Sequence, residues 1–228
     1  MAALHAQQSP AVEDYAKAIY SLSQRDDDAV STSAVAERLG VSAASASAMV
    51  KRLSELELVE HERYHGVSLT PAGERIALEV IRHHRLLELY LAEALGMPWD
   101  RVHDEAEVLE HAISPELSDR IAAKLGEPTR DPHGDPIPTR DGAVDEGPTV
   151  SLQALEPGAR GVFARVSDAN PELLRFLSQK GISPGMRFEV IDKDPFEGPL
   201  YVRFGTEVQP LAGGTTRAMR VELDRGDR

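Results

Sequence analysis

The order of helix and turn signals between residues 31 and 69 constrains the fold more than any other feature of the sequence. Ser31 offers an N-cap for a short helix that Gly40 ends, and Ser42 caps the next helix, SAASASAMVKRLSELEL. The segment VEHERYHGVSLT follows, with two short strand-like runs on either side of a turn. Two short helices joined by a glycine-containing turn, and followed by a hairpin, predict a winged helix-turn-helix.

Helices are predicted on both sides of this module, and strands toward the C-terminus. Apolar residues recur at helical spacing over 11–25, and a long helix begins at Pro71. Two more helices are expected over 100–111 and after the capping residue Ser114. Prolines and glycines crowd 126–150, which predicts a loop and a linker. The later runs GVFARV, MRFEVID, LYVRFG and RAMRVEL predict a small β-barrel of about five strands.

The predicted fold class is therefore mainly α, with a β wing and a small C-terminal β-barrel. Its parts are a winged helix-turn-helix DNA-binding domain (1–76), a helical domain (77–142), a linker (143–154) and a β-barrel domain (155–228).

The composition excludes several classes of protein. Without cysteine the chain forms neither a disulfide scaffold nor a thiolate metal site. No apolar run approaches the ~20 residues that cross a bilayer, and no secretory signal is recognisable, so we expect a cytoplasmic protein with no membrane partner. The net charge of −13 argues at first against DNA. However, residues 31–75 are close to neutral, and the excess acid lies downstream, where it is available to hold cations.

The second helix of the module presents a face of small and hydroxyl side chains. Small side chains let a helix lie deep in the major groove, and hydroxyls contact bases or phosphates. Because the face lacks a bidentate Arg or Asn at its start, we expect specificity to depend on methyl contacts and DNA shape. A solvated serine face is the alternative, but the order of helix, turn, helix and hairpin favours DNA. The predicted DNA-binding residues are Thr32, Ser33, Ser42, Ala44, Ser45, Ser47, Ala48, Lys51, Arg52, Arg63 and Tyr64.

Two helical segments each bring carboxylates and histidines to one face. In VHDEAEVLEH they lie at i, i+3 and i+4, with a further histidine one turn earlier, and in RHHRLLEL they lie at i and i+4. Carboxylates with imidazoles suit a hard or borderline divalent ion, and the absence of sulfur argues against a soft one. Either group alone is typical of a solvated helix face, whereas both beside a DNA-binding module favour a metal site. The residues are Glu107, Glu110, His111, His103, His84 and Glu88, with His83 and Glu105 expected to be exposed bystanders.

Several strings together resemble the diphtheria toxin repressor family of iron- and manganese-dependent repressors. They are EDYAKAIY, VIRHHRLLE, MPWDRVHDEAEVLEHAIS and DPHGDPIP, and the likeness is close over 11–140 and looser over 155–228. The resemblance implies a homodimer of winged-helix subunits that binds double-stranded operator DNA and controls metal-homeostasis genes. It also implies that the helical domain binds metal and forms the dimer, that the C-terminal domain is similar to SH3, and that the chain is not an enzyme.

The resemblance further implies two metal sites. The family's primary site would fall on Asp14, Glu107, Glu110 and His111. Its ancillary site would fall on His84, Glu88 and His103, with help from the C-terminal domain. The family's ligand positions in that domain align near Asn170 and Leu173, so that Asp168 or Glu172 would have to substitute.

The ligand types favour Mn(II). The iron-dependent members have a methionine and a cysteine where this chain has Asp14 and Glu107, and an oxygen-rich site suits Mn(II). Fe(II) is the second choice, and Zn(II), Co(II) or Cd(II) are expected to substitute in vitro. Lys17 stands where the manganese-dependent members carry a second carboxylate, which argues against a binuclear cluster of their kind.

Two other functions are compatible with parts of the pattern. A winged-helix regulator that senses a small organic ligand would leave the His/Glu pairs merely structural, and would bind DNA regardless of chelator. A metallohydrolase would need an open coordination position and a general base beside a substrate cleft. No G-x-S-x-G, H-E-x-x-H or P-loop pattern supports an enzyme.

Overall fold

The computed structural model describes residues 9–24, 29–62, 66–168, 170–196 and 198–224. Its α-helices are α1 (Pro10–Ser23), α2 (Thr32–Arg38), α3 (Ala43–Glu55), α4 (Pro71–Leu95), α5 (Val102–Leu109), α6 (Pro115–Lys124), α7 (Pro171–Gln179) and α8 (Gly214–Ala218). Its strands are β1 (Val59–Glu62), β2 (Gly66–Leu69), β3 (Val150–Ser151), β4 (Arg160–Val166), β5 (Arg187–Lys193), β6 (Leu200–Phe204), β7 (Glu207–Leu211) and β8 (Met219–Leu223), and Leu152–Ala154 forms a short 3-10 helix. Among the described residues, no helix combines the length and the apolar character of a membrane span.

The internal contacts divide the chain into two compact units. The first consists of residues 1–84, 110–113 and 138–143, and the second of 85–109, 114–137 and 144–228. The division falls inside α4, which therefore contributes residues to both units.

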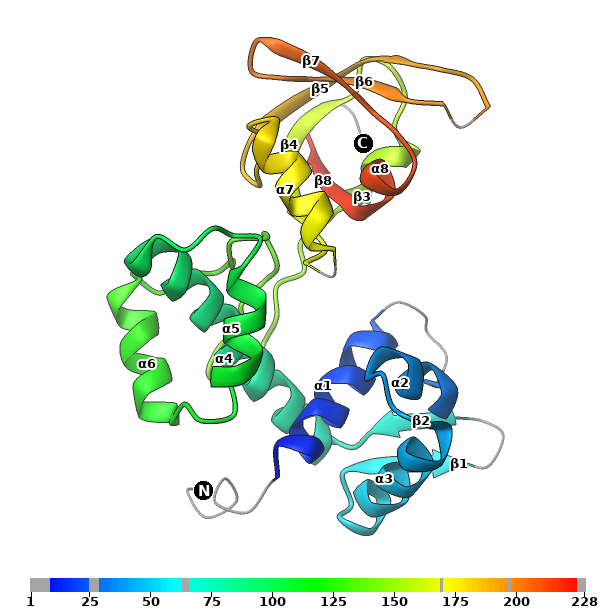
Figure 1. The fold of residues 1–228 in the computed structure, drawn as a ribbon, viewed down its shortest axis with the longest axis vertical. Coiled ribbons are helices and arrows are strands. Elements are labelled where there is room, and N and C mark those ends of the chain that lie inside the picture. Colours follow the sequence, from blue (N-terminus) through cyan, green and yellow to red (C-terminus); the bar gives the residue numbers. More distant parts are fainter. Residues whose placement is uncertain (1–8, 25–28, 63–65, 169, 197, 225–228) are drawn as a thin grey trace. The chain divides into compact units, whose positions relative to one another are not determined.

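The first unit contains the predicted winged helix-turn-helix. Helices α1, α2 and α3 pack with the antiparallel hairpin β1–β2, as Figure 1 shows. Ile19 of α1, Val35 of α2 and Leu53 of α3 are fully buried and meet in one core with Val67 of the hairpin. The apolar residues that recur at helical spacing in the sequence thus pack α3, the second helix of the module, against α2, the first.

Side-chain hydroxyls cap the starts of four helices. Each accepts a hydrogen bond from the backbone N–H three residues later, which satisfies one of the donors that a helix start leaves open. Distances from N to Oγ are 3.1 to 3.2 Å. The capping residues are Ser31 for α2, Ser42 for α3, Thr70 for α4 and Ser114 for α6.

A tight turn follows α6 in the second unit. Asp131 Oδ1 accepts hydrogen bonds from the backbone N–H groups of His133 (2.8 Å) and Asp135 (2.9 Å), which closes the turn around Gly134. Gly134 has a φ of +87°, and a Cβ at this position would lie 1.9 Å from the carbonyl oxygen of Ala164. The close approach of this turn to β4 therefore requires glycine.

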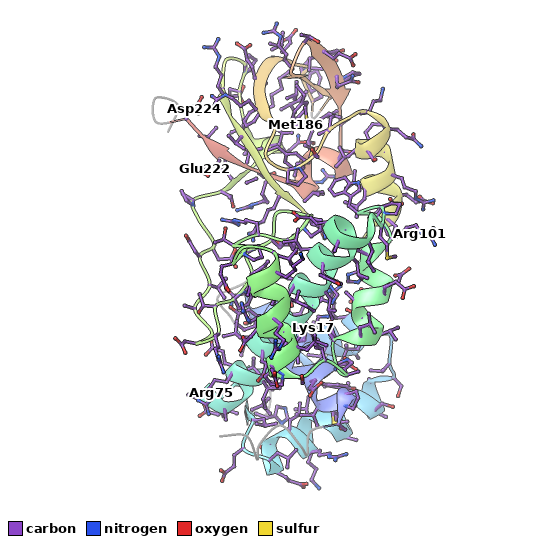
Figure 2. The ribbon with its side chains drawn as sticks, turned by 90° about the vertical axis from the view of Figure 1, so that its left-hand side faces the viewer. Lys17, Arg75, Arg101, Met186, Glu222 and Asp224 are labelled. Atoms are coloured by element: carbon purple, nitrogen blue, oxygen red, sulfur yellow. The ribbon has the colours of Figure 1, made fainter. Side chains whose placement is uncertain are left out.

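The rest of the second unit is a six-stranded antiparallel sheet in the order β3-β8-β4-β5-β6-β7. Phe163, Leu200 and Met219 lie fully buried on one side of it, together with Leu177 of α7. Met186, labelled in Figure 2, is partly buried against this core. The sheet and α7 form the small C-terminal β domain that the sequence predicts.

The structure differs from the predicted elements in several places. The sheet has six strands among the described residues, because β3 pairs with β8 and β7 with β6. Leu152 is fully buried in the core of the sheet, so the predicted linker 143–154 includes residues that the β domain uses. The helix predicted over 100–111 is shorter, at Val102–Leu109.

Candidate metal centres and DNA-binding surface

One group of ligand-type side chains joins α1 to the connection between α5 and α6. Nε2 of His111 lies 3.0 Å from Oδ1 of Asp14 and 3.6 Å from Oε1 of Glu110. The side chain of Glu110 is completely buried, whereas that of Asp14 is 38% exposed. The three offer ligand atoms within 4.8 Å of one another, so that one cation can reach all three. We call Asp14, Glu110 and His111 the α1 centre.

Two further residues lie at the α1 centre. Oε2 of Glu13 is 2.5 Å from Nδ1 of His111, on the opposite side of the imidazole from Asp14. Nδ1 of His84, which is buried, lies 2.5 Å from Oε2 of Glu110. Glu13 was not predicted from the sequence, although it precedes Asp14 directly, since helical spacing does not show that both carboxylates reach the same imidazole.

Glu107, which the resemblance assigns to the primary site, extends from α5. Its Oε1 lies 3.8 Å from Nε2 of His103, and its side chain is 43% exposed. This spacing is the i, i+4 contact that the sequence predicts. A role as a metal ligand remains a prediction for Glu107.

A second group, within the second unit, consists of Glu88, His103 and Asp168. Nδ1 of His103 lies 3.3 Å from Oε1 of Glu88 and 3.1 Å from Oδ2 of Asp168. Glu88 is fully buried on α4, and Asp168 follows β4. We call these three residues the α5 centre. It brings together α4, α5 and the C-terminal β domain.

The two carboxylates of the α5 centre stabilise the charged form of His103. Hydrogen bonds from His103 to Asp168 and then to Glu88 raise its pKa from 6.5 to about 10, against the opposing effect of burial. Burial would raise the pKa of Asp168, but His103 outweighs it and lowers that pKa below its usual value. Without a metal, a proton on His103 therefore supplies positive charge at this centre.

A buried histidine of the DPHGDPIP loop lies behind the α5 centre. Nε2 of His133 donates a hydrogen bond of 2.7 Å to the carbonyl oxygen of Trp99, and its Nδ1 is 3.5 Å from Oε2 of Glu88. Burial opposes the charged form of His133, but Glu88 and Asp131 raise its pKa to about 9. Burial also raises the pKa of Asp131 well above its usual value. In the sequence, this loop pointed only to the family resemblance, and no role was predicted for His133.

Glu172, the other proposed substitute ligand, lies in the first turn of α7. Its backbone N–H donates to Oδ1 of Asn170, the N-cap, and its side chain is exposed. It lines a pocket with Leu173 and Thr215 rather than joining the groups of ligand atoms found among the described residues. Of the two proposed substitutes, Asp168 is the one beside His103.

The predicted DNA-binding face of α3 is open to solvent. All its predicted residues in α3 and at the N-cap are exposed, while Ala46, Val50 and Leu53 of the same helix are buried. Ser42 and Ser45 are joined by a hydrogen bond of 2.8 Å between their hydroxyls, and Lys51 extends into solvent near Glu55. Thr32 and Ser33 begin α2. The wing residues Arg63 and Tyr64 lie outside the described residues.

One prediction about residues that neighbour the metal centres in the sequence is wrong. His83, expected to be exposed, is only 7% exposed. The reason is that α4 has apolar residues on most of its circumference, including Val80, Ile81 and Leu86, all buried. Glu105 on α5 is exposed, as predicted.

Comparison with known proteins relates each part of the chain to a described domain. Residues 8–67 match the family model "Iron dependent repressor, N-terminal DNA binding domain", and residues 70–139 match "Iron dependent repressor, metal binding and dimerisation domain". Residues 150–223 match the "FeoA domain".

Several known proteins are similar to this chain over nearly its whole length. The diphtheria toxin repressor of Corynebacterium efficiens is 30% identical over 220 residues, which cover 92% of this chain and 94% of the relative. The iron-dependent repressor IdeR of Mycobacterium tuberculosis is 30% identical over 223 residues, covering 92% and 96%. A solved manganese-dependent transcriptional repressor in complex with manganese is 44% identical with a TM-score of 0.87, covering 93% of this chain and all of that one.

The winged helix-turn-helix, the metal-binding and dimerisation domain and the C-terminal FeoA domain define a metal-dependent transcriptional repressor. Because the relatives match over more than nine tenths of the chain at 30% identity or more, the family can also be named. The chain belongs to the diphtheria toxin repressor family of iron- and manganese-dependent repressors. It is therefore not an enzyme, and the metallohydrolase and the organic-ligand sensor are set aside.

Proposed function

We propose that Mn(II), with Fe(II) as the second choice, binds at the α1 centre and allows a homodimer of this chain to bind operator DNA. The observation that carries the proposal is the meeting of Asp14 of α1 with Glu110 and His111 of the α5–α6 connection. Their donors are carboxylate oxygens and an imidazole nitrogen, and such oxygen-rich sets suit Mn(II). The manganese complex of a 44% identical repressor supports the same choice of metal.

The residues of the α1 centre supply a way to couple the metal to α1. A bound divalent ion would supply the positive charge that lets Glu13, Asp14 and Glu110 stay close together. His111 lies between two of these carboxylates and holds α1 to the α5–α6 connection. Since α1 packs against α2, α3 and the hairpin, its position affects how α3 is presented to DNA.

The energy required is within reach of metal binding. Converting a state from 1:99 to 99:1 requires about 5.5 kcal/mol of differential affinity. Coordination at structural sites supplies ~10 kcal/mol. A single ion per chain that binds the DNA-competent state preferentially is therefore sufficient.

The α5 centre is proposed as a second site. Glu88, His103 and Asp168 offer two carboxylates and an imidazole from three different segments. Because Asp168 belongs to the C-terminal β domain, an occupied α5 centre would fix that domain to α4 and α5. Binding there requires His103 to release its proton, so occupancy rises with pH.

The exposed face of α3 is proposed to read the operator. In a dimer two copies of α3 contact half-sites about one helical turn of DNA apart. A regulator of genes works where the chromosome is, so we place the protein in the cytoplasm.

A DNA-binding titration tests the proposed function. Duplexes selected from a random pool in the presence of Mn(II) are labelled, and binding is followed by fluorescence anisotropy with Mn(II), anaerobic Fe(II), Zn(II) or chelator. We expect tight binding with metal and weak binding with chelator. Zn(II) is expected to substitute, because divalent zinc binds most sites of this kind more tightly than manganese. Equal affinity in chelator would refute the proposal.

A further inference from the structure

A lysine of α1 lies at the proposed metal centre. Lys17, labelled in Figure 2, is one helical turn beyond Glu13 and Asp14. Its Nζ donates hydrogen bonds to both carboxylate oxygens of Glu110, at 2.9 and 2.8 Å, and lies 3.2 Å from Nδ1 of His84. All of these residues belong to the first unit.

Burial makes this ion pair important for the chain without metal. The side chain of Glu110 is fully buried, and that of Lys17 is only 16% exposed. A buried carboxylate is strongly unfavourable unless a positive charge and hydrogen bonds compensate it. Lys17 provides both, through its contacts with the two oxygens of Glu110. The ammonium group thus already occupies the place of a cation beside one carboxylate of the α1 centre.

The same carboxylate is one of the three proposed ligands. With both oxygens of Glu110 bonded to Lys17, a divalent ion that uses Glu110 must displace one of those hydrogen bonds or share the carboxylate with the ammonium group. Either arrangement places like charges close together in a partly buried site, where their repulsion is weakly screened.

We infer that Lys17 is a built-in cation that competes with the divalent ion for Glu110 and limits the α1 centre to a single ion. Lys17 is then a specificity-determining residue. It lowers the affinity of the centre, so that metal must reach a higher free concentration before the repressor is loaded. The inference rests on the proposed function of the α1 centre and adds how its affinity and stoichiometry are set.

Direct metal binding to the full-length chain tests the inference. The variant His103→Gln serves as background, because it removes the imidazole of the α5 centre. Binding of Mn(II) is measured by isothermal titration calorimetry, and bound metal per chain by elemental analysis after gel filtration. In this background we expect one ion per chain, and Asp14→Ala should remove it.

Substitutions of Lys17 then separate charge from shape. Lys17→Met removes the positive charge and should bind Mn(II) at least tenfold more tightly, still with one ion. Lys17→Arg keeps the charge and should bind as the background does. Lys17→Glu adds a carboxylate and should bind two ions per chain, with an electron paramagnetic resonance spectrum of spin-coupled manganese.

The apo-protein gives a second readout. With chelator present, Lys17→Met should melt at a lower temperature than Lys17→Arg, and saturating Mn(II) should raise its melting temperature by more. If Lys17→Met does not fold without metal, Lys17→Gln, whose amide still donates to Glu110, provides the same comparison.

Two results would overturn the inference, and they differ from failure of the proposed function. If Lys17→Met and Lys17→Gln bind Mn(II) no more tightly than Lys17→Arg does, Lys17 does not compete with the ion. Two ions per chain in the His103→Gln background would show that it does not limit stoichiometry. If Asp14→Ala removes no bound ion from the His103→Gln background, the α1 centre does not bind metal, and the proposed function fails instead.

Discussion

At the scale of single residues, Gly134 shows how the backbone sets the geometry of the second unit. Its φ of +87° and the nearby carbonyl oxygen of Ala164 leave no room for a Cβ. The turn that it allows places His133 next to Trp99 and Glu88. A side chain at this position would therefore disturb the docking of the loop on β4 and the surroundings of the α5 centre together.

We predict that Gly134→Ala lowers the free energy of unfolding of the second unit by about 2–4 kcal/mol, because the new methyl group collides with backbone. Gly126→Ala is the matched control, since Gly126 has a φ of +79° with nothing near its Cβ position. It should cost only the strain of the left-handed conformation, about 1–2 kcal/mol. Urea unfolding followed by the fluorescence of the single tryptophan, Trp99, measures both. Equal losses for the two variants would contradict the packing argument.

His103 makes the apo-protein sensitive to high pH. Because Asp168 and Glu88 raise its folded-state pKa from 6.5 to about 10, its ion pairs stabilise the fold fully below pH 6.5, and that stability is lost as the pH rises toward 10. The raised pKa of His133, about 9, acts in the same direction.

With chelator present, we therefore expect the second unit to unfold at lower urea concentration as the pH is raised from neutral to about 10. In His103→Gln the dependence should be shallower, with the remaining slope due largely to His133. Tryptophan fluorescence again reports the transition. A wild-type midpoint that stays constant or rises over this range would contradict the protonated state assigned to His103.

Among the helices and strands, the features that could be predicted from the sequence are those that depend on residues close together in the chain. The caps at Ser31, Ser42 and Ser114 and the apolar faces of the helices depend on neighbours within a turn, and all are found as expected. β7 was missed because Pro210 and its polar neighbours show no alternation, and β3 because it has only two residues. β3 is held by pairing with β8, far along the chain, which no local pattern reveals, whereas β7 forms a hairpin with the preceding strand β6.

For the candidate sites too, local features could be predicted from the sequence and long-range contacts could not. Spacing along α5 and α4 identified the histidines and glutamates of both centres, whereas Asp14 and Asp168 came only from the family resemblance. It did not show that Glu13 reaches His111, or that Lys17 reaches Glu110. Those contacts join residues more than 90 positions apart in the sequence. They arise from the packing of α1 on the α5–α6 connection.

Helices α5 and α6 carry apolar side chains that the second unit leaves exposed. Val108 is 74% and Leu117 is 49% exposed, within the segment that matches a dimerisation domain. Exposed apolar residues in a segment that matches a dimerisation domain are candidates for its interface. We expect Leu117→Glu to weaken the dimer at least tenfold, as measured by sedimentation equilibrium. Val208→Glu, at an exposed apolar site on β7, is the control and should leave the dimer intact. An unchanged dimer in Leu117→Glu would place the interface elsewhere.

In the molecule as a whole, negative charge is gathered around positions that cations can occupy. The chain has a net charge of −13 although residues 31–75 are nearly neutral, and both centres consist of carboxylates around histidines. In the apo-protein Lys17 and the protonated His103 compensate part of that charge. Under the proposed function, a bound divalent ion would take over part of this compensation, and its binding would link metal concentration to DNA binding.

The most direct test of this account compares the wild-type chain with Asp14→Ala in operator binding, with saturating Mn(II) and with chelator. Asp14 is partly exposed, so its loss should leave the fold and the dimer intact, as circular dichroism and gel filtration can verify. We predict that Mn(II) strengthens operator binding by wild type and by the control Glu105→Ala. In Asp14→Ala this gain should fall by ~100-fold or more, beyond the ~10–100-fold typical of residues that only support ligands. Full Mn(II)-dependent binding by Asp14→Ala would contradict the central claim.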